Sequence, residues 1–305
     1  MDRAEVRVAA VDIGTNTVRM LVADVAGDQI HDVARAVDVV GLGRGLDASG
    51  AIAAESMDAA IAALTGYGQR IREAMPSRIR VVATSASRDA SNSDELMTRI
   101  EGALGVAPDV ITGEEEAGLA FTGAIWGAGS GGRHLVIDPG GGSTEFVSGV
   151  EAPEASVSID IGSVRLTDRH LAALPPTSAE LAGATSLVRE MFGTVPIPEY
   201  PFAGIGVAGT FTSLAGIHLG LDRYDRARIH RTVLALADLE RMVQDLSGMT
   251  LEETEAIPSL DPKRAPVILA GAIVVLEAVR RSKLESVTVS ETDMLEGIVL
   301  GLTRG

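Results

Sequence analysis

Two short stretches of this chain repeat one arrangement, and they constrain its fold more than any other feature. Each has an apolar run that ends in an aspartate, a turn of glycine and polar residues, and a second apolar run. The stretches are residues 12–17 (DIGTNT) and 138–144 (DPGGGST), so the aspartates lie 126 residues apart. Each predicts a strand, a tight turn and a second strand. The repeat indicates one duplication and two related halves.

The two turns have the composition of an anion site. Backbone N–H groups and hydroxyls in such a turn can surround an anion, and a neighbouring carboxylate can hold a metal ion. Either turn alone is equally compatible with ordinary turn chemistry. Their pairing at matching offsets favours two facing halves that clasp a phosphate chain. The predicted phosphate-binding residues are Thr15, Asn16, Thr17, Gly140, Gly141, Gly142, Ser143 and Thr144, with Asp12 and Asp138 as predicted metal ligands.

Length and residue pattern predict two α/β domains. At 305 residues the chain exceeds the usual size of a single core. Aromatic residues are only 3% of the chain, so Ala, Val, Leu and Ile must build the cores. We expect domains of residues 1–125 and 126–305, with the last helix able to pack back on the first. Strands are predicted at 8–11, 18–25, 30–40, 79–83, 109–111, 133–138, 144–150, 155–161, 203–207 and 286–289, and helices at 53–75, before 104, from 112, 163–174, 178–192, 236–247, 263–282 and from 294.

Composition and charge exclude several classes of function. The chain has no cysteine, which excludes thiol nucleophiles, disulfides and Cys-based zinc sites. A net charge of −16 argues against nucleic-acid or membrane-surface binding, which needs a broad basic field. The N-terminus lacks an apolar signal core, and the most apolar stretch, 265–279, is shorter than a membrane span. We therefore predict a soluble cytoplasmic protein.

Three consecutive glutamates follow Thr112 at a predicted helix start. Thr112 and Glu115 fit a capping box, and Glu114 suits the positive end of the helix dipole. Glu116 lies beyond the capping positions. An acid without a structural role is a candidate general base. Glu116 is therefore the predicted catalytic carboxylate.

Residues 41–45 (GLGRG) are glycine-rich but do not form a dinucleotide fingerprint. Their spacing differs from G-x-G-x-x-G, and no helix is expected directly after them. We predict a glycine-rich loop. Arg223, Arg226, Arg228, His230 and Arg231 form the densest basic run. This run is either a solvated loop or a guide for a polyanionic substrate.

Several motifs in a fixed order resemble those of the exopolyphosphatase/guanosine pentaphosphate phosphohydrolase (Ppx/GppA) family. They are DIGTNT, ATSASRDASN, GEEEA, DPGGGSTE, SIDIGSVRLT, GVAGTFTSLA and SETDMLEGI, and together they cover nearly the whole chain. The resemblance implies two actin-like, ribonuclease H-like domains flanking a cleft, as in the acetate kinase, sugar kinase, Hsp70 and actin superfamily. The chain resembles a short two-domain form, without the additional helical domains of longer members.

The resemblance also implies roles for individual residues. Glu116 is expected to position or deprotonate the attacking water, and Arg88 to grip the terminal phosphate. Asp138 resembles the magnesium-associated acid and Glu145 a second active-site carboxylate. Gly209 and Thr210 are expected to form a third phosphate loop. Pro139 stands where an aliphatic residue is usual and removes one N–H from the second hairpin.

The implied activity is magnesium-dependent exopolyphosphatase, with short chains as a possible preference. The motifs leave hydrolysis of guanosine pentaphosphate open as an alternative at the same site. A superfamily kinase or an alarmone-binding regulator are further alternatives. Five scattered histidines disfavour a phosphohistidine mechanism. Helical surfaces rich in Ala and Val would permit a homodimer.

Overall fold

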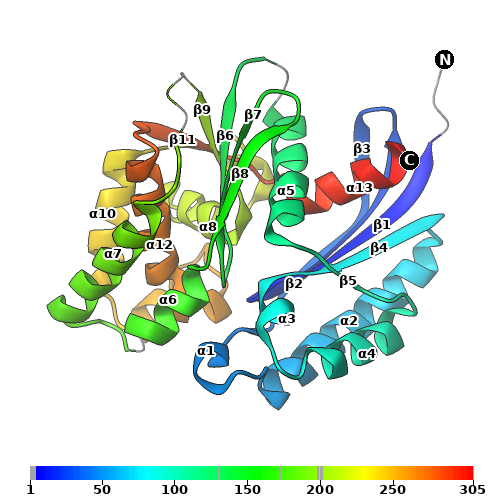
Figure 1. The fold of residues 1–305 in the computed structure, drawn as a ribbon, viewed down its shortest axis with the longest axis horizontal. Coiled ribbons are helices and arrows are strands. Elements are labelled where there is room, and N and C mark those ends of the chain that lie inside the picture. The colour runs from blue at the N-terminus through cyan, green and yellow to red at the C-terminus, as the bar shows by residue number, and fades with distance from the viewer. Residues whose placement is uncertain (1–4, 129–130, 172, 198, 200–201, 305) are drawn as a thin grey trace. The chain divides into compact units, whose positions relative to one another are not determined.

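The computed structural model describes residues 5–128, 131–171, 173–197, 199 and 202–304 (Figure 1). The chain divides into two compact units. Unit 1 comprises Met1–Gly123 together with Asp293–Gly305, and unit 2 comprises Ala124–Thr292. The C-terminal segment thus belongs to the same unit as the N-terminal strands. No helix within the described ranges is both long enough and apolar enough to cross a membrane.

Unit 1 is built on a five-stranded sheet of order β3-β2-β1-β4-β5. The first three strands form an antiparallel meander, whereas β4 and β5 run parallel to β1. Central strand β1 is buried from Val8 to Ile13 and is mainly apolar there, because both of its faces are covered. The strands are β1 (Val6–Ile13), β2 (Thr17–Ala26), β3 (Gln29–Val39), β4 (Arg78–Ala83) and β5 (Asp109–Val110).

Helices cover both faces of this sheet (Figure 1). One core includes Val11 of β1 with side chains of α2 and α4, and the other includes Val8 and Ala10 with side chains of α13. Strand alternation therefore places Asp12 on the α13 face. The helices are α1 (Leu46–Ser49), α2 (Ala54–Ala74), α3 (Ser85–Asp89), α4 (Ser93–Leu104), α5 (Gly113–Ala128), whose residues to Gly123 belong to unit 1, and α13 (Met294–Arg304).

Unit 2 is built on a six-stranded sheet of order β10-β11-β9-β6-β7-β8. Strands β6, β7 and β8 form an antiparallel meander, and β9 and β11 continue parallel to β6. A short antiparallel strand, β10, completes the edge. The strands are β6 (His134–Pro139), β7 (Thr144–Gly149), β8 (Pro153–Ile159), β9 (Ala203–Gly206), β10 (Val233–Ala235) and β11 (Ser286–Val289).

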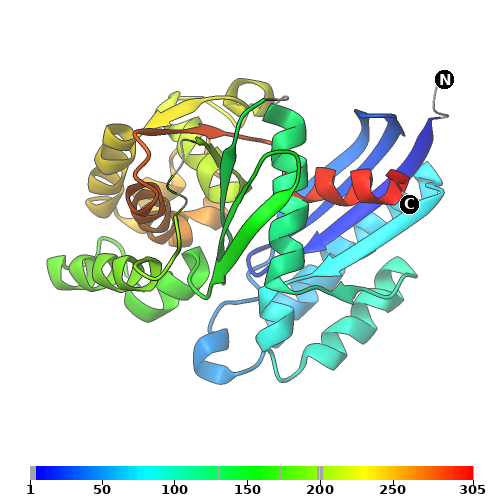
Figure 2. The same ribbon diagram turned by 45° about the horizontal axis from the view of Figure 1, so that its top comes forward.

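Helix α12 is the centre of the unit 2 core. It is buried along almost its whole length, and α7 and α10 lie beside it (Figure 2). A strongly apolar helix is expected in such a position. The helices of unit 2 are α6 (Ser163–His170), α7 (Ser178–Phe192), α8 (Ala208–His218), α9 (Arg226–Ile229), α10 (Leu236–Ser247), α11 (Leu251–Glu255), the 3₁₀ turn η1 (Pro262–Arg264) and α12 (Ala265–Arg281).

The two sheets share one connectivity. Order β3-β2-β1-β4-β5 of unit 1 corresponds to β8-β7-β6-β9-β11 of unit 2, with β10 as an addition. This confirms the α/β class and the duplicated actin-like architecture. The helix expected over residues 163–174 ends at His170, with residue 172 outside the described residues. Two prolines at 175–176 cannot continue a helix, which explains the shorter element.

Helices α5 and α13 cross at unusually close range within unit 1. A Cβ atom added to Gly297 of α13 would lie 2.0 Å from the backbone oxygen of Leu119 in α5. One added to Gly123 would lie 1.7 Å from the backbone oxygen of Asp293. Both glycines are needed because backbone meets backbone here, and neither partner can move like a flexible side chain. The crossing fixes the start of α13 against α5.

Substitution Gly297→Ala should therefore destabilise unit 1 by about 1–3 kcal/mol, the usual cost of overpacking a core. Gly301→Ala is the matched control, because this glycine lies in the same helix with open space around it. That change should be neutral or stabilise by up to about 1 kcal/mol, as Ala is the better helix former. Urea unfolding measures both. Equal stability of the two variants would contradict the close crossing.

Candidate active site

Both predicted hairpin turns close with the same hydrogen bond. Gly14 N–H donates to the Thr17 carbonyl at 2.9 Å, and Gly140 N–H donates to the Ser143 carbonyl at 2.9 Å. Pro139 lacks an N–H but precedes the donor of this bond, so the closure is the same in the two units. The duplication seen in the sequence is thus a duplication of backbone geometry.

Four N–H groups of the turns are available to a ligand. Within the part of the chain that the structure describes, the N–H groups of Thr15, Asn16, Gly141 and Gly142 have no hydrogen-bond partner. Thr15, Asn16 and Gly142 are buried. A buried N–H without a partner is costly, and a phosphate oxygen can satisfy it. Each hairpin therefore has the donors that an anion site requires.

The glycine-rich loop at 41–45 supports the first hairpin. The Asn16 carbonyl accepts hydrogen bonds from Val40 N–H and Gly41 N–H, both at 2.9 Å, and the Thr15 carbonyl accepts one from Gly43 N–H at 2.8 Å. A Cβ atom on Gly43 would lie 2.2 Å from the Thr15 methyl group. The segment is a loop, as predicted, and its glycines allow it to pack closely around the turn. The expectation that no helix follows it directly was wrong, because the short helix α1 begins at Leu46 with Gly45 as its N-cap.

The start of α6 supports the second hairpin in the same manner. The Gly140 carbonyl accepts from Ser163 N–H at 3.0 Å, and the Gly141 carbonyl accepts from Val164 N–H at 2.9 Å. A Cβ atom on Gly162 would lie 2.5 Å from the Gly141 carbonyl carbon. The SIDIGS segment thus holds the turn through its backbone, which explains the glycine in that motif.

The two carboxylate oxygens of Asp12 differ, because one is paired within the described part of the chain and the other is not. Its Oδ2 accepts a hydrogen bond from Nε of Arg19 at 2.7 Å and forms an ion pair with Nη2 at 2.7 Å, and the carboxylate is almost fully buried. Its Oδ1, like the Oδ1 of Asn16, is buried with no hydrogen-bond partner among the described residues. Burial raises the pKa of Asp12, although the charge of Arg19 opposes this effect.

The orphaned oxygens fit a hard divalent cation. Mg²⁺ prefers oxygen ligands and is commonly held by one or two carboxylates together with water and substrate phosphates. In the ranges that the structure describes, no group of three or more His, Cys, Asp or Glu side chains could hold a metal by itself. The donor set at Asp12 therefore fits a shared, substrate-assisted metal site and not a closed protein cage.

The three glutamates in the first turn of α5 differ in exposure and in their contacts. The Thr112 hydroxyl accepts from Glu115 N–H at 3.2 Å, and the Glu115 carboxylate pairs with Arg80. Glu114 and Glu115 are exposed. Two of the three acids thus lie at the surface of the helix start, and one of them has the expected capping contact.

Glu116 faces the interior and contacts Arg88. Its side chain is 13% exposed, and its Oε2 lies 3.2 Å from Arg88 Nη1. The same Nη1 donates to the Ile111 carbonyl at 2.7 Å. Glu116 lies one helical turn before the buried Ala120, on the face of α5 that packs in the α13 core. This periodicity brings it toward Asp12.

The surroundings of Glu116 raise its pKa to about 7. Burial is the largest cause, and the nearby charge of Asp12 acts in the same direction. The guanidinium of Arg88 opposes both. A carboxyl group poised near neutrality suits a general base.

The second hairpin carries two acids on opposite strands. Asp138 and Glu145 are direct cross-strand partners in the β6–β7 ladder. Glu145 is buried and accepts a hydrogen bond from the Ser158 hydroxyl at 2.6 Å. Ser158 belongs to the SIDIGS segment and was not predicted from the residues to have a role. The register of β7 and β8 is the signal that could have found it.

The predicted third loop contains a strained residue and an arginine that sequence reasoning missed. Ala208 has a φ of 66°, which is uncommon for a residue with a Cβ. The guanidinium of Arg264 lies on Gly209, where an added Cβ would be 1.8 Å from its Nη1. Thr210 is buried, and its side chain lies against Gly271 of α12. Nothing in the sequence pairs Arg264 with Gly209.

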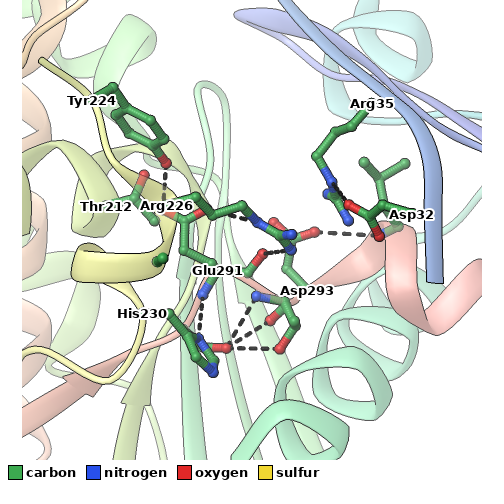
Figure 3. A network of polar contacts seen from close by, with 12 residues as sticks. Asp32, Arg35, Thr212, Tyr224, Arg226, His230, Glu291 and Asp293 are labelled. Carbon is green, nitrogen blue, oxygen red and sulfur yellow. Dashed lines mark hydrogen bonds and ion pairs between the residues drawn. The ribbon is translucent and has the colours of Figure 1, made fainter. Parts of the chain in front are cut away.

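Two residues of the basic run between Arg223 and Arg231 form contacts with Glu291 of unit 2. Arg226 donates to the Glu291 carbonyl at 3.0 Å and forms an ion pair with its carboxylate, which Tyr224 also contacts (Figure 3). Glu291 N–H donates to His230 Nδ1 at 3.2 Å. Arg223 and Arg228 are exposed. The run therefore mixes anchoring side chains with solvated ones.

Unit 1 brings together Asp12, Arg88 and Glu116 but adds two residues that the sequence analysis did not name for a role. Arg19 contacts Asp12 and also pairs with Asp293 at the start of α13. Arg19 is the cross-strand partner of Asp12. The hairpin register could have predicted that pair, whereas Asp293 lies too far along the chain for any local pattern. The other predicted residues, Asp138, Gly140 to Thr144, Glu145, Gly209 and Thr210, lie in unit 2.

Similarity to known proteins is consistent over nearly the whole chain. Residues 21–304 match the model of the Ppx/GppA phosphatase family. Exopolyphosphatase 2 of Mycobacterium tuberculosis is 44% identical over 314 residues, with 97% of this chain and 98% of that protein covered. Exopolyphosphatase 1 of Mycobacterium bovis is 30% identical, with 96% and 87% covered.

Solved structures of similar proteins also match nearly the whole chain. The crystal structure of an exopolyphosphatase-like protein has a TM-score of 0.92 at 35% identity and covers 98% of both chains. That of an Aquifex aeolicus Ppx/GppA family member has a TM-score of 0.83 at 27% identity, with 99% of this chain and 98% of that chain covered.

Fold and hairpins define the class of this protein, an actin-like α/β protein with a duplicated sheet and a duplicated hairpin turn. The chain belongs to the Ppx/GppA phosphatase family, as its motifs predicted. It is therefore an enzyme of the hydrolase class. Family membership implies a divalent metal requirement.

The raised pKa of Glu116 can be measured directly by ¹³C NMR of protein labelled at the Glu carboxyl carbon. One signal, absent in Glu116→Gln, should titrate with a midpoint near 7, so that the carboxylate predominates only above that pH. Arg88→Gln should move the midpoint upward and Asp12→Asn downward, because the two charges act oppositely. Titration of that signal near 4.5, the ordinary value, would contradict the burial argument.

Proposed function

We propose that this protein is an exopolyphosphatase that removes terminal phosphate from inorganic polyphosphate with the aid of a divalent metal ion, magnesium by preference. Each step releases orthophosphate and leaves the chain one phosphate shorter. The names of the mycobacterial relatives support this substrate class. A preference for short polyphosphate is a further part of this proposal.

One observation carries the proposal. Glu116 is a largely buried carboxyl group with a pKa near neutrality, next to an arginine, in the same unit as a buried aspartate that has an unpaired oxygen. This is the set of parts that phosphoryl transfer to water requires: a base, a cation for the phosphate, and a metal ligand.

Glu116 acts on water in this mechanism. Its carboxylate accepts a proton as the water oxygen attacks the terminal phosphorus. The bond to the bridging oxygen breaks in line with the attack, and that oxygen leaves with the shortened chain. Because the leaving group is a phosphate already able to carry negative charge, no strong general acid is needed.

Charge and position are supplied by the other residues. Arg88 Nη1 contacts Glu116, which supports a role for its guanidinium in binding the phosphate that the water attacks. The unpaired N–H groups of each hairpin bind phosphate oxygens, and Thr17, Ser143 and Thr144 contribute polar groups beside them. Asp12 in unit 1 and Asp138 in unit 2 are the proposed metal ligands, with Glu145 as a further carboxylate. A bound metal neutralises charge on the transferred phosphate.

Glu116→Gln should lower kcat by about 10²–10⁴-fold while leaving polyphosphate binding nearly unchanged, because only proton acceptance is lost. Glu114→Gln removes an acid from the same helical turn at an exposed position and should retain wild-type turnover. Steady-state phosphate release and equilibrium binding measure the two effects. Equal losses for both variants would move the role away from Glu116.

Parallel assays with different substrates test the reaction itself. Polyphosphate of defined length should release orthophosphate, EDTA should abolish the release, and Mg²⁺ should restore it. Faster release from guanosine pentaphosphate would replace polyphosphate by that nucleotide as the substrate. ATP formation from ADP and polyphosphate would indicate a kinase, and tight nucleotide binding without phosphate release would indicate a regulator.

Cytoplasmic location and a homodimer are further parts of the proposal. The absence of cysteine is compatible with a reducing compartment. The acidic composition makes nucleic acid an unsuitable partner and leaves a small polyanion, bound at local positive sites, as the expected ligand.

A further inference from the structure

A chain of alternating charges runs through unit 1 from Asp12 to the C-terminal helix. Arg19 forms ion pairs with both Asp12 and Asp293, and Arg35 pairs with Glu296. Asp12, Asp293 and Glu296 are all buried. Burying three carboxylates is unfavourable unless each is paired, so the arginines are needed in these places.

The helix start fixes Asp293 through several independent contacts. Its Oδ1 accepts from Leu295 N–H at 3.2 Å, which caps the helix start, and its own N–H donates to Glu296 Oε2 at 2.9 Å, the return contact of a capping box. Its backbone oxygen lies at the close crossing with Gly123. These contacts hold Asp293 in place independently of Arg19. Asp293 therefore fixes the position of the Arg19 guanidinium.

The guanidinium of Arg19 divides its donors between the two acids. Nε and Nη2 both contact Oδ2 of Asp12, while Nη1 contacts Asp293. This fork occupies one carboxylate oxygen of Asp12 and turns the other, Oδ1, away from any protein donor among the described residues. A lysine ammonium has the same charge but cannot reproduce the planar fork.

We propose that Arg19 and Asp293 are positioning residues of the phosphatase site, which orient Asp12 so that its Oδ1 alone is offered to the metal ion. The proposal rests on the proposed function in one respect, the role of Asp12 as metal ligand. It makes the C-terminal helix part of the site's supporting structure. The negative charge of Asp293 also offsets that of Arg19, which would otherwise repel the cation from Asp12.

A purely structural role would give a different result, and the same hairpin contains the matched comparison. Arg7 and Asp24 form a second cross-strand pair between β1 and β2, with Arg7 Nε and Nη2 on the two carboxylate oxygens at 2.7 and 2.8 Å. That carboxylate is held by both oxygens, and it lies at the opposite end of the ladder from the turn. Arg7→Lys thus imposes the same chemical change away from the site.

The experiment measures Mn²⁺ binding to the whole protein by the loss of the free Mn²⁺ electron paramagnetic resonance signal. Arg19→Lys should weaken Mn²⁺ affinity on the order of 10–100-fold, the range typical of residues that orient a metal ligand. Arg7→Lys should leave it unchanged. Phosphate release by Arg19→Lys should recover as the metal concentration is raised, whereas that of Glu116→Gln should not.

A second pair of variants covers the case in which Arg19→Lys does not fold. Asp293→Asn leaves Asp12 and Arg19 in place but removes the charge that fixes the Arg19 guanidinium, and should weaken Mn²⁺ binding about tenfold or more. Asp24→Asn makes the same chemical change in the Arg7–Asp24 pair, away from the site, and should leave Mn²⁺ affinity unchanged. Thermal unfolding of all four variants, recorded beside Mn²⁺ binding, separates stability from positioning.

Wild-type affinity in Arg19→Lys and Asp293→Asn, or equal weakening in their controls, would overturn the proposal. Mn²⁺ binding that is absent or insensitive to Asp12→Asn would overturn it together with the metal role of Asp12. Polyphosphate hydrolysis is scored separately. Hydrolysis without an affinity change refutes only the positioning role, and an affinity change without hydrolysis refutes only the proposed substrate.

Discussion

The structure of unit 1 depends on how it neutralises one buried carboxylate. Asp12 ends the central strand, on the face that alternation has already committed to the α13 core through Val8 and Ala10. A carboxylate there loses most of its hydration and requires a cation at hydrogen-bonding distance. Arg19 meets that requirement, but it brings a charge that needs its own partner, Asp293. The burial of Asp12 thus accounts for Arg19 on β2 and for Asp293 at the start of α13.

Asp12 needs Arg19 as a partner, and Arg19 needs Asp293. These two ion pairs explain why the C-terminal segment packs in the first unit. The strands of unit 1 cannot provide Asp293, and the glycine pair at positions 123 and 297 allows α13 to approach α5 closely enough to deliver it. Apolar contacts from Met294, Leu295 and Ile298 stabilise the same docking. Packing and electrostatics therefore select one position for the helix, which suits a site whose ligands must be held within fractions of an ångström.

Local sequence patterns predicted much of this, for a physical reason. The hairpins at Asp12 and Asp138, helix α7 and strand β11 follow from periodicity and turn chemistry within a few residues. Glu116 could be distinguished from Glu114 and Glu115 because helix capping depends only on neighbouring residues in the sequence. Asp293 and Arg264 were not predicted for any role, since their partners Arg19 and Gly209 are distant in sequence. Short elements such as β10 and α9 also carry too little periodicity to be seen.

The duplicated hairpins differ at one pair of equivalent positions, and that difference separates their electrostatics. The partner of Asp12 is Arg19, whereas the partner of Asp138 is Glu145, each at the same register from its turn. The first hairpin offers a single oxygen of a partly neutralised carboxylate. In the second hairpin two acidic residues occupy the register positions at which the first hairpin pairs an acid with an arginine. The two hairpins thus share one backbone geometry but differ in side-chain chemistry at one register position, so the duplication was kept in the backbone and changed in the side chains.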